Sequence, residues 1–398
     1  MKTNLSGNKW LALLSVTLAY SFAFLTRYIW SPIMSDVGAE FQISSTQMGI
    51  YMTAFMIGYL IMQIPGGILA DRLRPKYLLM TCVGIATAGS AVFSGISSYG
   101  IGLLIRGLEG LSLGGIYSSC SKIVSGYFPQ KDRAVAMGIL LASPSLGILL
   151  ANSLGEPLNE LLGWRQTVRI VAYIGVAVFL LLFLFVRPGE KETGGAQKGG
   201  LLDGTKLYFA DKQQVLLALS GMLSMFASVG FATWMNTYMK TELGYSGLQG
   251  GVLLTVYSIV GIAAACISGP VVKWFNWDPR RFLIVLMALG AVCMAGFGMV
   301  RSYAALMTLG IGYGIVVNLP SAHLANFCIQ RAPKHYIATM CALENLIMQS
   351  GAMIQSYVIG AAADSRGSYH VMWTTFAVAC VLSVAAMCLF NPNGGKTE

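Results

Sequence analysis

The sequence is dominated by apolar stretches of about 20 residues, the length that a helix needs to cross the hydrocarbon core of a bilayer. Hydrophobic residues make up 56% of the 398 residues and charged residues 11%, whereas about a quarter of the residues of a soluble protein are charged. In lipid every backbone polar group needs a partner within the chain, which only helices and closed barrels provide. A membrane β-barrel has short segments of alternating hydrophobicity instead. We therefore expect an all-α integral membrane protein.

Twelve such spans can be placed on the sequence, in two groups of six. They lie near residues 10–33, 46–70, 77–97, 100–127, 134–156, 166–186, 213–239, 247–272, 281–300, 303–329, 337–363 and 370–391. The long polar stretch between the sixth and seventh spans holds several glycines among mixed charges, which is typical of a linker. We predict an N-terminal six-helix half at 1–187, a cytoplasmic linker at 188–212 and a C-terminal six-helix half at 213–398.

The positive charges predict the orientation. With the N-terminus inside, eighteen of the 26 Lys and Arg residues fall in inner loops and termini, and four fall in outer loops. This bias satisfies the positive-inside rule and predicts a multi-pass protein of the cytoplasmic membrane with both termini in the cytoplasm. The net charge of +10 is explained by topology, so we expect the lipid bilayer and not nucleic acid as the partner of these charges.

One charge stands alone in the first span, between Trp10 and Ile33: Arg27. An arginine in the bilayer core is costly, so it usually faces a water-filled cavity or a partner and marks a functional site. The alternative is that Arg27 lies close enough to the end of its span to extend its side chain to the lipid headgroups. The residue types alone leave both interpretations open.

Neither a metal site nor an enzyme is indicated by the reactive residues. The eight cysteines lie in apolar stretches without CxxC or zinc-like spacing, so we interpret them as small hydrophobic residues. The three histidines form no HExxH or paired metal motif, and no nucleophile elbow or phosphate loop is present. We expect no metal, no cofactor, no enzymatic activity and a monomeric protein.

The loop after the second span carries a family motif. It runs from Gly67 through Leu69-Ala70-Asp71-Arg72 to Lys76 and resembles the G-x-L-A-D-R-x-G-R-K signature of the major facilitator superfamily, with Arg74 and Pro75 as departures. The resemblance implies the major facilitator fold. It also implies that Asp71 and Arg72 act as a conformational latch near the start of the eleventh span.

The fourth span continues this resemblance. Arg106 and Gly110 match the family's R-x-x-x-G pattern, which adds Arg106 to the latch candidates. Glu109 lies three residues after Arg106, so a structural ion pair between the two is the alternative interpretation. Gly110 and Gly114 form a small-xxx-small face, which predicts a close helix contact.

Spans 1, 2, 4, 5 and 7 together resemble the anion:cation symporter branch, which includes carriers of sugar acids and other organic anions. Thr26-Arg27 to Ser31 occupies the branch's D-R-x-x-x-S motif, and Tyr59 and Gln63 to Gly67 occupy its second-helix motif. The resemblance implies that Arg27 binds the substrate carboxylate and that Tyr59 donates a hydrogen bond to it. Two acidic residues of the pattern are replaced, one by Thr26 and the other by Leu113.

Polar and titratable residues within the apolar spans of both halves suggest further site residues. Glu344, Glu109 and His323 are the candidates for proton coupling, because each is a titratable group within an apolar span. A structural role remains the alternative for His323. The remaining candidates for lining the substrate cavity are Trp234, Asn236, Tyr238, Asn345 and Gln349.

These observations predict a secondary active transporter that moves a small organic carboxylate by alternating access. We expect proton-coupled uptake. The alternatives are an anion exchanger or facilitator, and a drug/proton efflux transporter on the same fold, although the fifth span matches the efflux signature only in part. An efflux transporter of cations would also have a carboxylate in its N-terminal cavity where this chain has Arg27.

Overall fold

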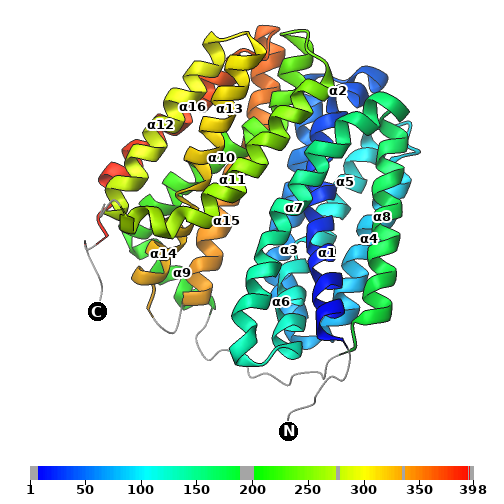
Figure 1. Ribbon diagram of the computed structural model, residues 1–398, viewed down its shortest axis with the longest axis vertical. Coiled ribbons are helices and arrows are strands. Elements are labelled where there is room, and N and C mark those ends of the chain that lie inside the picture. Colours follow the sequence, from blue (N-terminus) through cyan, green and yellow to red (C-terminus); the bar gives the residue numbers. More distant parts are fainter. Residues whose placement is uncertain (1–7, 189–200, 275–277, 334–336, 393, 395–398) are drawn as a thin grey trace. The chain divides into compact units, whose positions relative to one another are not determined.

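The structure is a computed structural model that describes residues 8–188, 201–274, 278–333, 337–392 and 394. These residues form α-helices joined by short connections, without a β-strand (Figure 1). The helices are α1 (Lys9–Tyr28), α2 (Trp30–Phe41), α3 (Ser45–Arg72), α4 (Pro75–Phe93), α5 (Tyr99–Leu113), α6 (Ile116–Tyr127), α7 (Gln130–Leu162), α8 (Trp164–Phe185), α9 (Leu201–Ala210), α10 (Lys212–Thr241), α11 (Gly247–Trp274), α12 (Pro279–Met299), α13 (Tyr303–Asn318), α14 (Ser321–Arg331), α15 (Ile337–Arg366) and α16 (Val371–Leu389).

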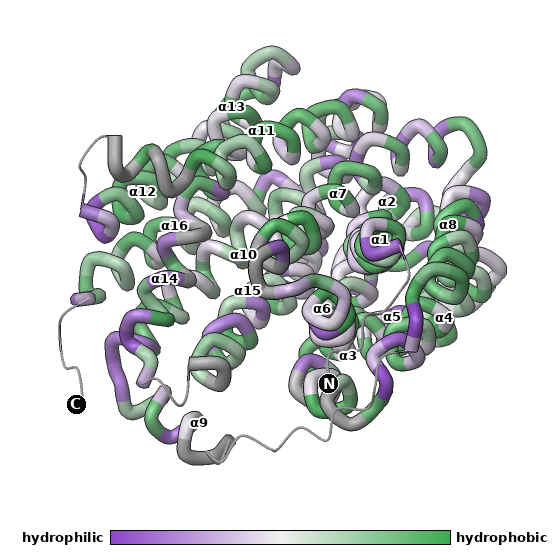
Figure 2. The backbone as a smooth tube through the Cα atoms, turned by 60° about the horizontal axis from the view of Figure 1, so that its bottom comes forward, coloured by the Kyte–Doolittle hydropathy of each residue, from purple (hydrophilic) through white to green (hydrophobic). Residues whose placement is uncertain are grey.

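Every predicted span coincides with one helix or with two consecutive helices. Within the described residues, nine segments are long and apolar enough to cross a membrane. Figure 2 shows hydrophobic residues along the long helices, with many of the hydrophilic residues near helix ends and in the connections. The chain is therefore an all-α membrane protein.

Three of the predicted spans are interrupted, and proline or glycine accounts for each interruption. Proline has no backbone N–H, so Pro32 cannot complete the helical hydrogen bond to the Tyr28 carbonyl, and α1 ends at Tyr28 before α2 begins at Trp30. Pro320 separates α13 from α14 in the same way. The third break, between α5 and α6, falls at Gly114 and Gly115.

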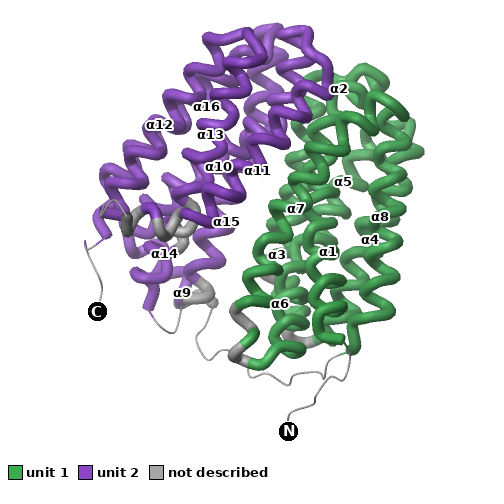
Figure 3. The backbone as a smooth tube through the Cα atoms, in the orientation of Figure 1, with its two compact units in different colours: residues 1–194 green, residues 195–398 purple. Residues whose placement is uncertain are grey.

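The chain divides into two compact units, Met1–Gly194 and Gly195–Glu398 (Figure 3). In the first unit the closest helix pairs are α3 with α5, α1 with α7 and α4 with α8. In the second unit α10 packs against α15 and α16, and α11 packs against α13. The predicted linker at 188–212 contains a helix, α9, that composition alone did not indicate.

Two glycines of α5 bring its backbone against that of α3. A Cβ atom on Gly110 would collide with the carbonyl oxygen of Phe55, and a Cβ on Gly114 would collide with that of Tyr59. The small-xxx-small prediction is therefore confirmed at both positions. This contact fixes where Phe55 and Tyr59 lie relative to the end of α5.

We predict that Gly110→Val separates α3 from α5 and destabilises the first unit. Overpacking at a well-packed site costs about 1–3 kcal/mol, and here the clash is with backbone, which cannot rotate away. The thermal unfolding midpoint of the purified protein should fall. Gly138→Val is the matched control, because a Cβ on Gly138 meets no atom within 4 Å; equal midpoints for the two variants would contradict the prediction.

Candidate functional site

Arg27 lies on α1 with its side chain buried, and only 4% of the residue is exposed. The apolar segment that contains it does not end near residue 33, as the sequence suggested, but continues through α2 to Phe41. Arg27 is therefore near the middle of this segment. This position and the burial of the side chain favour a functional site over the alternative interpretation, in which the side chain reaches the headgroups from the end of the span.

The Arg27 side chain lines a pocket within the first unit. The pocket has an empty volume of about 230 Å³, including space open to solvent, and its lining residues come from α1, α3, α5 and α6. They are Tyr20, Ala23, Phe24, Arg27, Phe55, Tyr59, Leu113 and Ile116. The structure thus brings together Arg27 and Tyr59, the two residues that the resemblance assigned to substrate binding.

Helix periodicity explains how these residues share one pocket. Tyr20, Ala23, Phe24 and Arg27 recur at the spacing of one helix face, which places them on the same side of α1. Phe55 and Tyr59 are four residues apart on α3 and share a face in the same way. The α1 spacing was visible in the sequence, and it is the signal that could have added Tyr20 and Phe24 to the candidates.

The pocket is electropositive because the charge of Arg27 has no acidic counterpart there. No acidic residue lines the pocket, and no ion pair within the described residues involves Arg27. Its buried Nε has no hydrogen-bond partner in the described part of the chain. An arginine can donate five hydrogen bonds in a planar fork that fits a carboxylate. Arg27 therefore has the charge and the free donor needed to bind an anion.

A second buried arginine, Arg106, is paired instead. Its Nη1 donates to Oε2 of Glu109 at 2.8 Å, and Ser90 donates to the other carboxylate oxygen of Glu109 at 2.9 Å. The same Nη1 lies 3.2 Å from the carbonyl oxygen of Thr26, so the pair is tied to α1 beside Arg27. The structure thus forms the ion pair that the sequence left as the alternative for Arg106 and Glu109.

The five predicted cavity residues of the second unit line neither the Arg27 pocket nor the pocket lined by Met287 and Tyr313 that is described below. The Trp234 ring lies 5.6 Å from that of Tyr369, and Tyr238 packs edge-on against Trp373 at 5.1 Å. Asn236 is buried against Gly250 of α11.

On α15, Asn345 is exposed and Gln349 is half-buried. The assignment of these five residues to a substrate cavity stays a prediction.

Glu344 on α15 is buried, with 5% of the residue exposed, and is bonded to a residue that the sequence analysis missed. Tyr208 of α9 donates its hydroxyl to Oε2 of Glu344 at 2.5 Å, while Oε1 has no partner in the described residues. Burial raises the pKa of Tyr208, and the nearby Glu344 carboxyl raises it further, so this phenol stays protonated and remains a donor. No local sequence signal joins two residues that lie 136 positions apart.

A clamp next to this contact holds the junction of α9 and α10. Arg331 at the end of α14 binds both carboxylate oxygens of Asp211, at 2.7 Å and 2.9 Å, and Asp211 is the N-cap of α10. Arg331 also donates to the carbonyl oxygens of Pro392 and Gly394 near the C-terminus. The clamp therefore fixes the end of α9 from which Tyr208 reaches Glu344.

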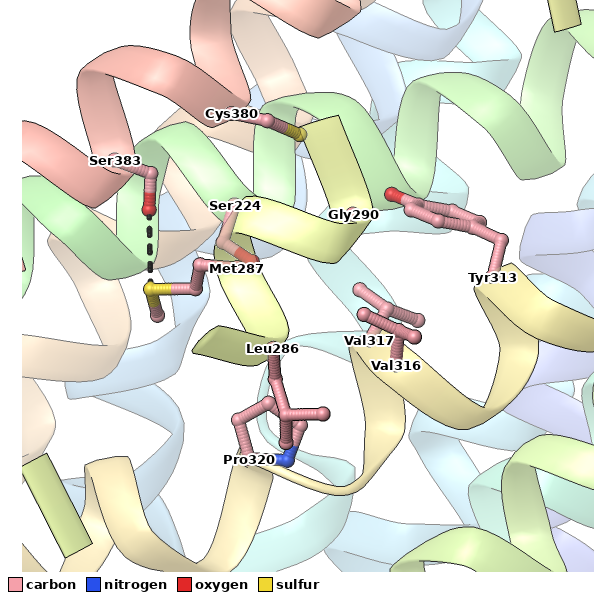
Figure 4. A pocket seen from close by; sticks show the side chains of 10 residues that line it. All are labelled: Ser224, Leu286, Met287, Gly290, Tyr313, Val316, Val317, Pro320, Cys380 and Ser383. Atoms are coloured by element: carbon pink, nitrogen blue, oxygen red, sulfur yellow. Dashed lines mark hydrogen bonds between the residues drawn. The ribbon is translucent and has the colours of Figure 1, made fainter. Parts of the chain in front are cut away.

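The second unit contains a pocket of its own with about 310 Å³ of empty volume, including space open to solvent (Figure 4). Its lining includes Met287 and Ser383, joined by a 3.6 Å hydrogen bond to the Met287 sulfur, and the buried Tyr313, whose hydroxyl end points toward Gly290. No charged residue lines it. This pocket lacks the group that would bind an anion.

The other candidates take less specific positions. The His323 ring packs edge-on against Phe282 at 5.6 Å. The side chains of Asp71 and Arg72 lie outside the described residues, so their latch role stays a prediction. No group of three or more His, Cys, Asp and Glu side chains in the described segments could hold a metal ion.

Comparisons with known proteins agree with this architecture. The family model described as "Major Facilitator Superfamily" matches residues 16–356. A cis,cis-muconate transport protein of Acinetobacter baylyi is 26% identical over 94% of both chains, and a D-galactonate transporter of Escherichia coli is 24% identical over 96% of this chain and 95% of its own length. The crystal structure of the nucleoside transporter NupG matches with a TM-score of 0.82 at 13% identity, covering 95% of this chain and 99% of that one, which shows the shared fold.

The Arg106–Glu109 pair should be structural. Glu109→Gln leaves a buried guanidinium without its counter-charge, which typically costs about 3–5 kcal/mol, so the unfolding midpoint should fall sharply. The double variant Arg106→Met/Glu109→Leu removes both charges and should recover much of this loss. Asp132→Asn is the control, because the half-exposed Lys9–Asp132 pair contributes about 0–1 kcal/mol. A midpoint of Glu109→Gln no lower than that of Asp132→Asn would contradict a structural role.

Proposed function

Because the chain belongs to the Major Facilitator Superfamily, and is therefore a membrane transporter and not an enzyme, we propose that it carries a small organic carboxylate across the cytoplasmic membrane by alternating access. Both termini face the cytoplasm in this proposal, in agreement with the distribution of Lys and Arg. The observation that carries the proposal is the buried Arg27, which has a free Nε and lies in a pocket without an acidic residue.

A carboxylate fits this site for physical reasons. A buried charge without a partner is unfavourable, so an anion that pairs with Arg27 gains a strong interaction in a medium of low dielectric constant. The planar guanidinium binds both oxygens of a carboxylate at once. Tyr59 lines the same pocket and offers a hydroxyl donor, which orients the bound acid.

The relatives support the same class of substrate. One is named for cis,cis-muconate and another for D-galactonate, and both of these compounds are carboxylic acids. The two relatives align over nearly the whole chain. An organic acid is therefore the substrate class that fits both the pocket and the relatives.

Uptake into proteoliposomes tests the role of Arg27. Arg27→Gln should abolish uptake of labelled organic acids. Arg27→Lys keeps the charge but loses the planar fork, so it should retain transport with KM raised by about tenfold or more. Arg169→Gln is the matched control, because Arg169 is an arginine of the same unit that does not line the pocket. If Arg27→Gln transports organic acids as well as the control, the proposed role of Arg27 is wrong.

We propose further that transport is coupled to protons through Glu344. Protonation of Glu109 would leave Arg106 unpaired, whereas Glu344 has no cationic partner among the described residues and can gain or lose a proton without breaking an ion pair. Gain or loss of a proton at Glu344 would directly alter its hydrogen bond with the Tyr208 hydroxyl. Glu344 is therefore the better candidate of the two.

Glu344→Gln should lose accumulation driven by a pH gradient while it retains exchange of internal for external substrate, because exchange needs no net proton movement. Tyr208→Phe should shift the pH dependence of accumulation, and Tyr357→Phe, an exposed tyrosine on the same helix as Glu344, should not. If Glu344→Gln and Glu109→Gln both still accumulate substrate, coupling through these groups is excluded and anion exchange or facilitated diffusion takes its place.

A further inference from the structure

We infer that the Arg27 pocket takes an unsaturated or aromatic carboxylic acid without hydroxyl groups, and not a polyhydroxylated sugar acid. The inference rests on the proposed function and adds the chemical class of the body to which the carboxylate is attached. It follows from the balance of polar and apolar groups around the pocket.

Very few hydrogen-bonding groups are available next to Arg27. Beside the guanidinium, the lining offers only the hydroxyls of Tyr20 and Tyr59. A sugar acid carries a hydroxyl on almost every carbon, and each buried hydroxyl needs a partner if binding is not to lose free energy. One of the tyrosines is already assigned to the carboxylate. The pocket therefore cannot satisfy the body of a sugar acid.

The remaining lining is apolar and partly aromatic. Phe24, Phe55, Leu113 and Ile116 supply most of it, and the Phe24 ring meets the Tyr20 ring edge-on at 5.4 Å. The Arg106 guanidinium packs against Phe55, 4.6 Å from its ring centre, and helps to hold the ring in place. Flat and fixed aromatic walls suit a planar, conjugated ligand, which stacks on rings without needing hydrogen bonds.

Leu113 further favours an apolar ligand over a hydroxylated one. Leu113 is 1% exposed and lines the pocket at the point where the sequence pattern of the anion:cation symporters has a glutamate. A carboxylate there could accept hydrogen bonds from substrate hydroxyls, whereas a leucine side chain offers only apolar contact. At this position the pocket therefore presents an apolar surface where the pattern has a hydrogen-bond acceptor.

A ligand that matches this lining has one carboxylate and a flat body without hydroxyl groups. Sorbate, a conjugated six-carbon monocarboxylate, and benzoate combine one carboxylate with a flat apolar body. Gluconate has the same number of carbons as sorbate but carries hydroxyls, so sorbate and gluconate form a matched pair of probes.

Binding of these three acids to the purified full-length protein, followed by the shift in thermal unfolding midpoint, tests the inference. Sorbate and benzoate should raise the midpoint, and the Kd of gluconate should be higher by about tenfold or more, the change that one unpaired buried hydroxyl already produces. Gluconate that binds as tightly as sorbate overturns the inference and leaves the anion-carrier proposal intact. If Arg27→Gln responds to the acids as the wild type does, or if none of the three acids binds the wild type, both proposals fail.

Leu113→Gln provides a second readout. The amide supplies hydrogen-bonding groups to the pocket, so the ratio of the gluconate and sorbate Kd values should fall, and an unchanged ratio in the folded variant overturns the inference. Leu111→Gln is the matched control, because it makes the same substitution on the same helix at a residue that does not line the pocket. If Leu113→Gln fails to fold, the ratio of the gluconate and sorbate Kd values of the wild type tests the inference alone.

Discussion

The cost of a charge inside an apolar helical bundle governs the arrangement of the functional residues. The charge of Arg106 is compensated by Glu109, which Ser90 also stabilises. Glu344 is compensated only in part, because one of its oxygens is bonded to Tyr208 and the other has no described partner. Arg27 is paired with no acidic side chain of the described residues. The partners of each charge therefore distinguish three roles. Arg106 and Glu109 form a structural ion pair, Glu344 is a candidate proton carrier, and Arg27 is a candidate anion site.

Close backbone packing gives the Arg27 pocket its shape. Gly110 and Gly114 let α5 approach α3 at the carbonyl oxygens of Phe55 and Tyr59, so the two side chains that face Arg27 are positioned by glycines on another helix. The break between α5 and α6 follows at Gly114 and Gly115, which places Leu113 and Ile116 at the ends of two short helices. Substitutions at these glycines therefore affect the pocket without touching a ligand.

The sequence predicts the helices well, because apolar length alone determines them, and it identifies Arg27 because a single charge in such a stretch is conspicuous. It predicts less of the packing. In an apolar helix such as α10 almost every residue looks equally suited to the core, so nothing local tells that Tyr238 faces Trp373 of α16. Contacts between distant elements are likewise invisible, as the hydrogen bond from Tyr208 to Glu344 illustrates. The packing partner of an apolar side chain and the hydrogen bonds between distant helices are both determined by the tertiary structure.

The absence of acidic residues from the Arg27 pocket has a consequence for coupling. A carboxylate at position 26 or 113 would compete with the substrate for the guanidinium, and anion binding would then favour its protonation. Thr26 and Leu113 cannot take up a proton in this way, so the proposed proton step has to occur at another group. Glu344 meets this requirement, and it is bonded to α9, which leads into α10 through the Asp211–Arg331 clamp. A change in the Glu344–Tyr208 bond would therefore act first on α9 and on the start of α10 in the second unit.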